Sequence, residues 1–148
     1  MQISFYHLTR LSLGKSLPKL LEKVLQQNLR CVVVASTEAD VQILNDQLWT
    51  YHPEGFLPHG TKKEGRPKDQ PVWISTAQEN PNESKVLVLT WPIPVENFDG
   101  FERIAYIFDG NKDDDLTAAR SLWKEYNTPD HTLAYWQQDE SGQWTQKG

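Results

Sequence analysis

The sequence contains a single cysteine, Cys31, among 148 residues. One thiol cannot form an intramolecular disulfide, which predicts a protein of the reducing cytoplasm. The longest apolar run, residues 31–35, is far shorter than the roughly 20 residues that cross a bilayer. Residues 1–6 have neither a basic start nor a long apolar stretch, so we expect no export signal. These absences favour a soluble cytoplasmic protein without a membrane segment.

Positive charge is also scarce, because 15 Lys and Arg stand against 20 Asp and Glu and give a net charge of −5. Phosphate contacts dominate affinity for nucleic acids, so this composition argues against tight, autonomous DNA or RNA binding. Aromatic residues are plentiful, with six Trp, five Tyr and five Phe. A surplus of aromatic side chains is typical of protein interaction surfaces. We therefore expect protein partners, and contact with DNA only through them.

The length fits one domain of about 100–200 residues, so we expect a single domain over residues 1–148. Apolar runs predict strands at residues 3–8, 30–36, 72–75, 85–90, 103–108 and 132–136. Amphipathic spacing predicts a helix capped by Ser16, with Pro18 in its first turn, and a helix capped by Thr37. A third helix should follow the aspartates at 113–115. This alternation predicts a three-layer α/β fold, with helices on both faces of a mostly parallel, Rossmann-like sheet.

Residues 13–16 (LGKS) follow a strand and open a helix, as the end of a phosphate-binding P-loop does. The full motif needs a glycine five positions before Gly14, where this sequence has Thr9. Asp109 follows a strand and resembles a metal-binding aspartate. A capped helix and an ordinary strand end fit these residues better, so the phosphate loop should not function. A degenerate P-loop-like nucleotide-binding protein remains the alternative.

Residues suited to catalysis or metal binding do not gather in the sequence. The four histidines, His7, His52, His59 and His131, lack metal-ligand spacing, and Cys31 has no second thiolate beside it. No G-x-S-x-G or comparable nucleophile turn occurs. We therefore predict a protein without catalytic residues, metal or cofactor.

Two basic segments could contact an anion. Residues 62–68 (KKEGRPK) fit a solvated loop, and a direct contact with nucleic acid would be weak and salt-sensitive. In the third helix, Arg120, Lys124 and Asn127 share one polar face, and Trp123 lies beside them. Two cations beside an indole would suit a peptide that ends in an aromatic residue and a carboxylate. The same spacing also fits a solvated helix face with Trp123 in the core.

The sequence resembles the chi subunit family of bacterial DNA polymerase III holoenzyme over nearly its whole length. The resemblance rests on the order and spacing of several short segments. They are residues 5–8 (FYHL), 32–36 (VVVAS), 48–49 (LW), 56–59 (FLPH), 71–74 (PVWI), 86–90 (VLVLT) and Arg120-x-x-Trp123-Lys124-x-Tyr126.

The resemblance implies a nucleotide-binding-like α/β fold without a phosphate loop, and a non-catalytic bridging role in replication. One surface would bind the acidic C-terminal tail of single-stranded-DNA-binding protein, which ends in aspartates and a phenylalanine. Arg120, Trp123 and Lys124 match the family's tail-binding positions. Asn127 stands where a further arginine can occur, which implies weaker tail binding.

The resemblance also implies a second surface, which binds the psi subunit and so ties chi to the clamp loader. In some bacteria a repair helicase competes for this surface. Trp49, Phe56 and Pro58 match it in this sequence.

Overall fold

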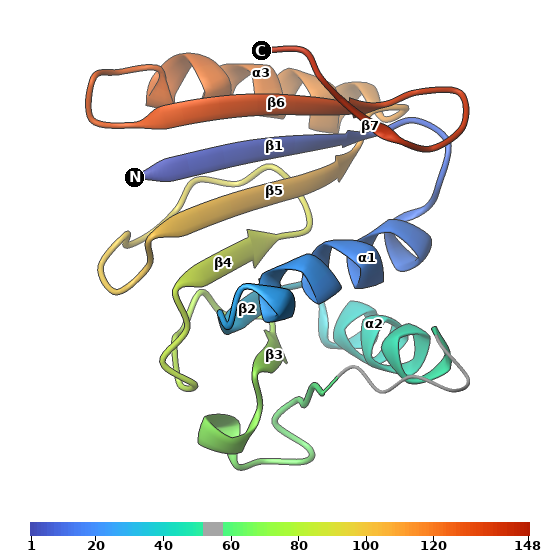
Figure 1. Cartoon of the computed structure of the whole chain (residues 1–148), viewed down its shortest axis with the longest axis vertical. Coiled ribbons are helices and arrows are strands. Elements are labelled where there is room, and N and C mark those ends of the chain that lie inside the picture. Colours follow the sequence, from blue (N-terminus) through green and yellow to red (C-terminus); the bar gives the residue numbers. More distant parts are fainter. Residues whose placement is uncertain (52–57) are drawn as a thin grey trace.

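The computed structural model describes residues 1–51 and 58–148. Figure 1 labels the elements that these residues form. Their bounds are β1 (Gln2–Leu8), α1 (Leu13–Gln26), β2 (Cys31–Val34), α2 (Glu38–Thr50), the short 3-10 helix η1 (Pro67–Asp69), β3 (Val72–Ser75), β4 (Val86–Leu89), β5 (Arg103–Asp109), α3 (Asp113–Tyr126), β6 (Thr132–Gln138) and β7 (Trp144–Gln146).

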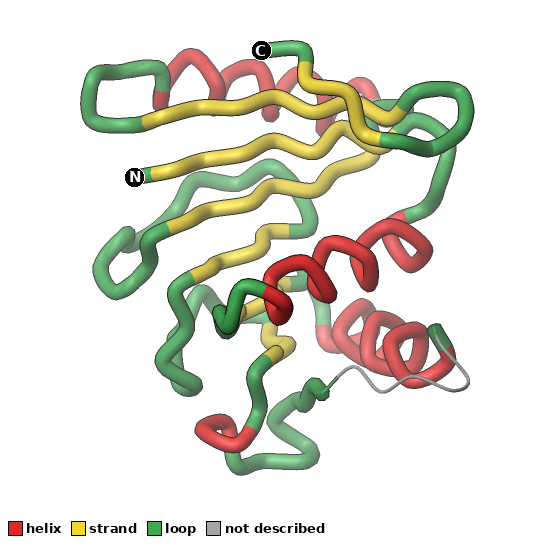
Figure 2. The backbone as a smooth tube through the Cα atoms, viewed as in Figure 1, coloured by secondary structure: helices red, strands yellow, loops and turns green. Residues whose placement is uncertain are grey.

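The strands form one sheet in the order β3-β2-β4-β5-β1-β6-β7. In Figure 2 they make a single yellow layer, from β3 at the bottom to β6 and β7 at the top. The pairings among β1 to β6 are parallel, and β6 and β7 pair antiparallel. α1 and α2 lie on one side of the sheet and α3 on the other (Figure 1). The predicted three-layer α/β fold with a mostly parallel sheet is confirmed.

The two faces of the sheet are packed with different side chains. On the α1 and α2 face, aliphatic residues such as Leu17, Leu44 and Val33 form one buried cluster. On the α3 face, Phe5 and Tyr106 belong to a second cluster that is rich in aromatic rings. Because both faces are covered, every residue of β2 and β4 is buried. The run of β-branched residues around β2 predicted this double burial.

The predicted cap of α2 is confirmed, whereas that of α1 is wrong. Thr37 Oγ1 accepts a hydrogen bond from the Asp40 N–H at 3.1 Å and so caps α2. α1 begins earlier than predicted, with Ser12 at the N-cap, so Pro18 lies inside the helix and past its first turn. Ser16 Oγ instead accepts a buried hydrogen bond from the Gln138 side chain at 3.0 Å. The Ser16 hydroxyl, which the local pattern predicted to cap the helix, therefore binds a residue distant in the sequence instead.

Strand β7 was not predicted from the sequence. It pairs with β6 through a turn at residues 139–143. Asp139 Oδ1 accepts hydrogen bonds from the N–H groups of Ser141 and Gln143 in this turn. Gly142 has a φ of +85°, a conformation that favours glycine. An Asp and Gly turn between two tryptophan-containing segments is a hairpin signal, and it could have predicted this strand.

Candidate functional site

The loop between β1 and α1 lies where related α/β folds present backbone N–H groups to a phosphate. In this chain, the side chain of Gln138, at the end of β6, accepts hydrogen bonds from those groups. Its Oε1 accepts hydrogen bonds from the N–H groups of Thr9, Arg10 and Leu11 at 3.1, 3.2 and 3.2 Å. Gln138 is only 4% exposed. Donors bonded to a buried side chain are not free for a phosphate, which weighs against the nucleotide-binding alternative.

A groove of about 480 Å³ lies on the α3 face of the sheet, between α3 and the strands beneath it. Arg120, Trp123 and Lys124 line it from α3. The groove is also lined by His7 from β1, Tyr135 from β6 and Lys147, which follows β7. We call this surface the α3 groove. The structure thus brings the three predicted tail-binding residues to one cavity.

Trp123 forms a wall of the α3 groove that the core holds in place. Its ring centroid lies 5.6 Å from that of Phe5 and 5.8 Å from that of Tyr135, in edge-to-face geometry. Phe5 is fully buried, and Trp123 itself is partly buried. Such contacts are a favourable arrangement of aromatic rings. The indole is therefore held in place by core residues on one side and accessible from the groove on the other. We call it the supported indole.

His7 and Tyr135 lie at the base of the groove, where His7 Nδ1 is 2.8 Å from the Tyr135 hydroxyl oxygen. Burial lowers the pKa of His7 below its ordinary value of 6.5, and Arg120 lowers it further, while Asp109 opposes both. Burial also raises the pKa of the Tyr135 hydroxyl, with Arg120 acting in the opposite direction. Both shifts favour uncharged side chains at neutral pH. The formal charges on the side chains that line the groove therefore come from Lys and Arg.

These cations have no acidic partner among the described residues. Within residues 1–51 and 58–148, the one salt bridge joins Lys62 to Glu38 at 2.9 Å. Arg120, Lys124 and Lys147 are exposed, and no Asp or Glu side chain lines the groove. The groove is thus a local positive surface on a protein of net charge −5. It could bind an anionic ligand with an apolar part that fits against an indole.

The loop at residues 62–68 holds two of its lysines against α2. Lys62 Nζ binds Glu38 at 2.9 Å, and Lys63 Nζ donates to Gln42 Oε1 at 3.0 Å. These contacts are exposed, so they stabilise the loop only modestly. They nevertheless direct two cations toward the protein itself, which weakens the case for nucleic-acid binding by this loop.

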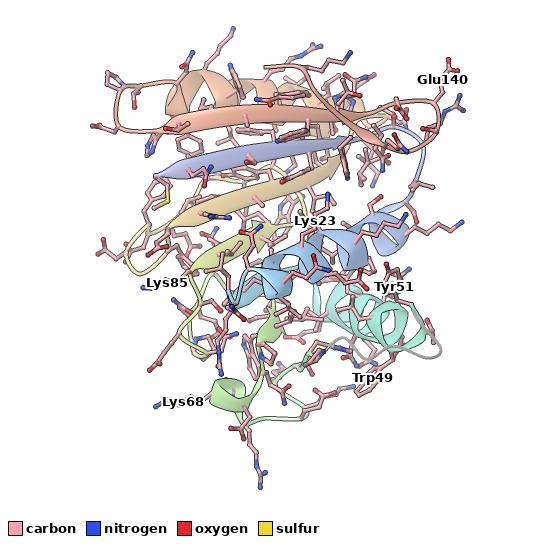
Figure 3. All side chains as sticks on the ribbon, viewed as in Figure 1. Lys23, Trp49, Tyr51, Lys68, Lys85 and Glu140 are labelled. Carbon is pink, nitrogen blue, oxygen red and sulfur yellow. The ribbon has the colours of Figure 1, made fainter. Side chains whose placement is uncertain are left out.

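The second predicted surface lies at the end of α2, far from α3 in the view of Figure 3. Trp49 is 51% exposed, and its ring centroid lies 4.8 Å from that of the buried His59. Pro58 is next to His59 in the chain and is partly buried. Phe56, the third predicted residue, lies outside the described residues. The structure thus places the large apolar ring of Trp49 at the surface here, beside the buried His59, and we call this the Trp49 surface.

The described residues, 1–51 and 58–148, contain neither a cluster of metal-ligating side chains nor a membrane-spanning helix. No group of three or more His, Cys, Asp or Glu side chains in them could hold a metal ion. No helix in them is long and apolar enough to cross a membrane.

Comparison with known proteins identifies the family. The family described as DNA polymerase III chi subunit, HolC, matches residues 1–134. The chain belongs to the chi subunit family. A relative from Rickettsia prowazekii (strain Madrid E), named "Probable DNA polymerase III subunit chi", is 33% identical over 115 residues, which cover 73% of this chain and 70% of the relative. The resemblance in the sequence is confirmed, and membership makes the chain an accessory subunit in DNA replication.

Part of the α3 groove of this chi-family chain was not predicted from the sequence. His7, Tyr135 and Lys147 lie outside α3, so helix periodicity carries no information about them. Residues 133, 135 and 137 alternate along one side of a strand, so a face containing Tyr135 was predictable. Its contact with α3 depends on the order of the strands in the sheet.

Proposed function

We propose that this chi-family chain is a non-catalytic bridging subunit of the replicase. Its α3 groove binds the acidic C-terminal tail of single-stranded-DNA-binding protein, and the Trp49 surface joins a psi subunit of the clamp loader. It acts in the cytoplasm and meets DNA only through the tail-bearing partner.

The observation that carries this proposal is the combination of unpaired cations with a supported indole in one groove. Arg120 and Lys124 lie one turn apart on α3, so both can face the same anionic segment. Charge-assisted hydrogen bonds from a guanidinium suit a terminal carboxylate or an aspartate. Trp123 offers an apolar wall for the tail's phenylalanine. A net-acidic subunit needs only this local positive surface to recognise an acidic partner.

The Trp49 surface supports the second contact by a different kind of chemistry. Trp49, near the end of α2, is 51% exposed. Tryptophan is a frequent anchor residue in protein interfaces. A psi subunit would cover this ring, and a repair helicase that uses the same surface would compete with it.

Calorimetric titration with a synthetic tail peptide, rich in aspartate and ending in phenylalanine, tests the first contact. Wild-type protein should bind, and R120A and K124A should each weaken binding. Lys19, exposed on α1 across the sheet from α3, provides a charge-matched control, and K19A should bind as wild type does. Failure of the wild-type protein to bind would refute the proposed tail contact.

Co-purification with psi tests the second contact. W49A should lose psi while it still binds the tail peptide, because the two surfaces are separate. R120A should show the reverse pattern. If W49A retained psi at wild-type levels, the assignment of the psi surface would be wrong.

A further inference from the structure

The chain after β7 runs alongside β6 and ends beside α3. The Lys147 N–H donates to the Tyr135 carbonyl oxygen at 2.7 Å, and the Tyr135 N–H donates to the Gly148 carbonyl oxygen at 3.1 Å. The strand pairing places Trp136 opposite Gln146, so Lys147 continues it opposite Tyr135. Backbone hydrogen bonds therefore fix the position of Lys147, although its side chain is exposed.

This pairing determines which face of the sheet Lys147 occupies. Side chains of residues directly opposite in an antiparallel pair lie on the same face. Tyr135 packs against Trp123 of α3, so Lys147 belongs to the α3 face, and it lines the α3 groove. Gly148 also lies against Trp123, because a β-carbon placed on it would be 3.6 Å from Cη2 of the indole. The segment after β7 thus forms a second wall of the groove, opposite the cations of α3.

The charges nearby leave Lys147 able to bind an external anion. Lys147 has no carboxylate within salt-bridge distance among residues 1–51 and 58–148. It also borders a hollow beside the β6–β7 turn, where Asp139 and Glu140 lie. The Asp139 carboxylate is engaged by N–H groups of the turn. Figure 3 shows Glu140 at the outer end of this turn.

Lys147 lies beyond residues 1–134, the part that matches the chi family. The geometry points to Lys147 as a further specificity residue of this chain, one that contacts acidic side chains of a bound peptide from the wall opposite Arg120 and Lys124. This inference rests on the proposed binding of an acidic, phenylalanine-tipped peptide in the α3 groove. It adds that an element outside the matched region selects for negative charge upstream of the peptide's end.

A double-mutant cycle with the full chain tests this role. The probe is a synthetic peptide of aspartates that ends in phenylalanine, with a second set in which each aspartate is replaced in turn by asparagine. K147A should weaken binding about two- to fivefold, as expected for an exposed ion pair. K147E should weaken it further, K147R should bind as wild type does, and K19A is the matched control. The effect of K147A should disappear on at least one asparagine peptide, which identifies the aspartate that Lys147 contacts.

Each negative result would lead to a different conclusion about Lys147 and the α3 groove. If K147A and K147E bind like K19A while R120A binds more weakly, Lys147 has no role and the groove keeps its proposed function. If K147A weakens every asparagine peptide equally, Lys147 acts without contacting the acidic side chains and the inference is wrong. If wild-type protein does not bind the aspartate peptide, both the inference and the proposed tail contact are wrong.

Discussion

In the loop between β1 and α1, the N–H groups of Thr9, Arg10 and Leu11 are bonded to Gln138. In the α3 groove, by contrast, Arg120 and Lys124 have no carboxylate partner among the described residues. Both regions carry groups that suit an anion. Only the α3 groove leaves those groups exposed to a ligand.

The difference teaches that donors alone do not make a binding site. A buried polar group must be paired within the protein, since leaving it unpaired costs about 1–3 kcal/mol. Gln138 meets this requirement in the β1–α1 loop, so a phosphate would have to displace a hydrogen-bonded side chain. The cations of the groove are solvated, and a ligand displaces only water from them.

The largest expected effect is a loss of stability when Gln138 no longer bonds the β1–α1 loop. Q138A should lower the free energy of unfolding by about 2–4 kcal/mol, because it removes a buried side chain that bonds three backbone N–H groups and the Ser16 hydroxyl. Urea denaturation measures this change. Q143A replaces an exposed glutamine on the neighbouring turn and should change stability by less than about 0.5 kcal/mol. Equal stability of the two variants would show that Gln138 does not hold the loop.

The next effect distinguishes Trp123, the supported indole of the groove, from the more exposed Trp49. W123A should lower stability by about 2 kcal/mol, less than for a fully buried tryptophan, and should abolish detectable peptide binding. W49A should leave peptide binding unchanged and cost less stability, since Trp49 is half exposed. Urea denaturation and titration calorimetry measure both properties. Normal peptide binding by W123A would remove the indole from the site.

Charge removal should weaken binding in the α3 groove alone, and it should leave stability unchanged in both regions. R120A should weaken binding of the aspartate peptide by about tenfold, the value of a charge-assisted hydrogen bond. K15A, in the P-loop-like motif, should bind the peptide as wild type does. Neither wild type nor K15A should bind ATP. Micromolar ATP binding that K15A abolishes would restore the nucleotide-binding alternative and reverse the comparison.

The smallest effect concerns pH and the base of the groove. The pKa of His7 is lowered in the folded protein, so the neutral ring is favoured there. Its contribution to stability is full above the unfolded value of 6.5 and is lost as the pH falls through the folded pKa. Between about pH 7.5 and 5, the Tm of wild type should therefore fall slightly more than that of H7Q. Parallel Tm curves would contradict this role for burial.

Much of the fold was predictable because its signals are local. The buried run at β2, the Thr37 cap and the apolar face of α3, with Ala119 and Leu122 buried, all depend on residues close in the chain. The grouping of Arg120, Trp123 and Lys124 was predictable for the same reason, since one helix carries all of them.

The sequence by itself determined the three-layer α/β arrangement, the family and one cationic helix face. The fold and the helix face follow from burial patterns and helical spacing, which are properties of neighbouring residues, whereas the family followed from a resemblance of short segments over nearly the whole chain. Only the tertiary structure decided that Gln138 fills the β1–α1 loop and that Lys147 stands across the groove from α3. Gln138 contacts residues more than a hundred positions away in the sequence, and Lys147, which follows β7, lines one groove with residues of α3. The order of strands brings such residues together, and no local pattern encodes that order.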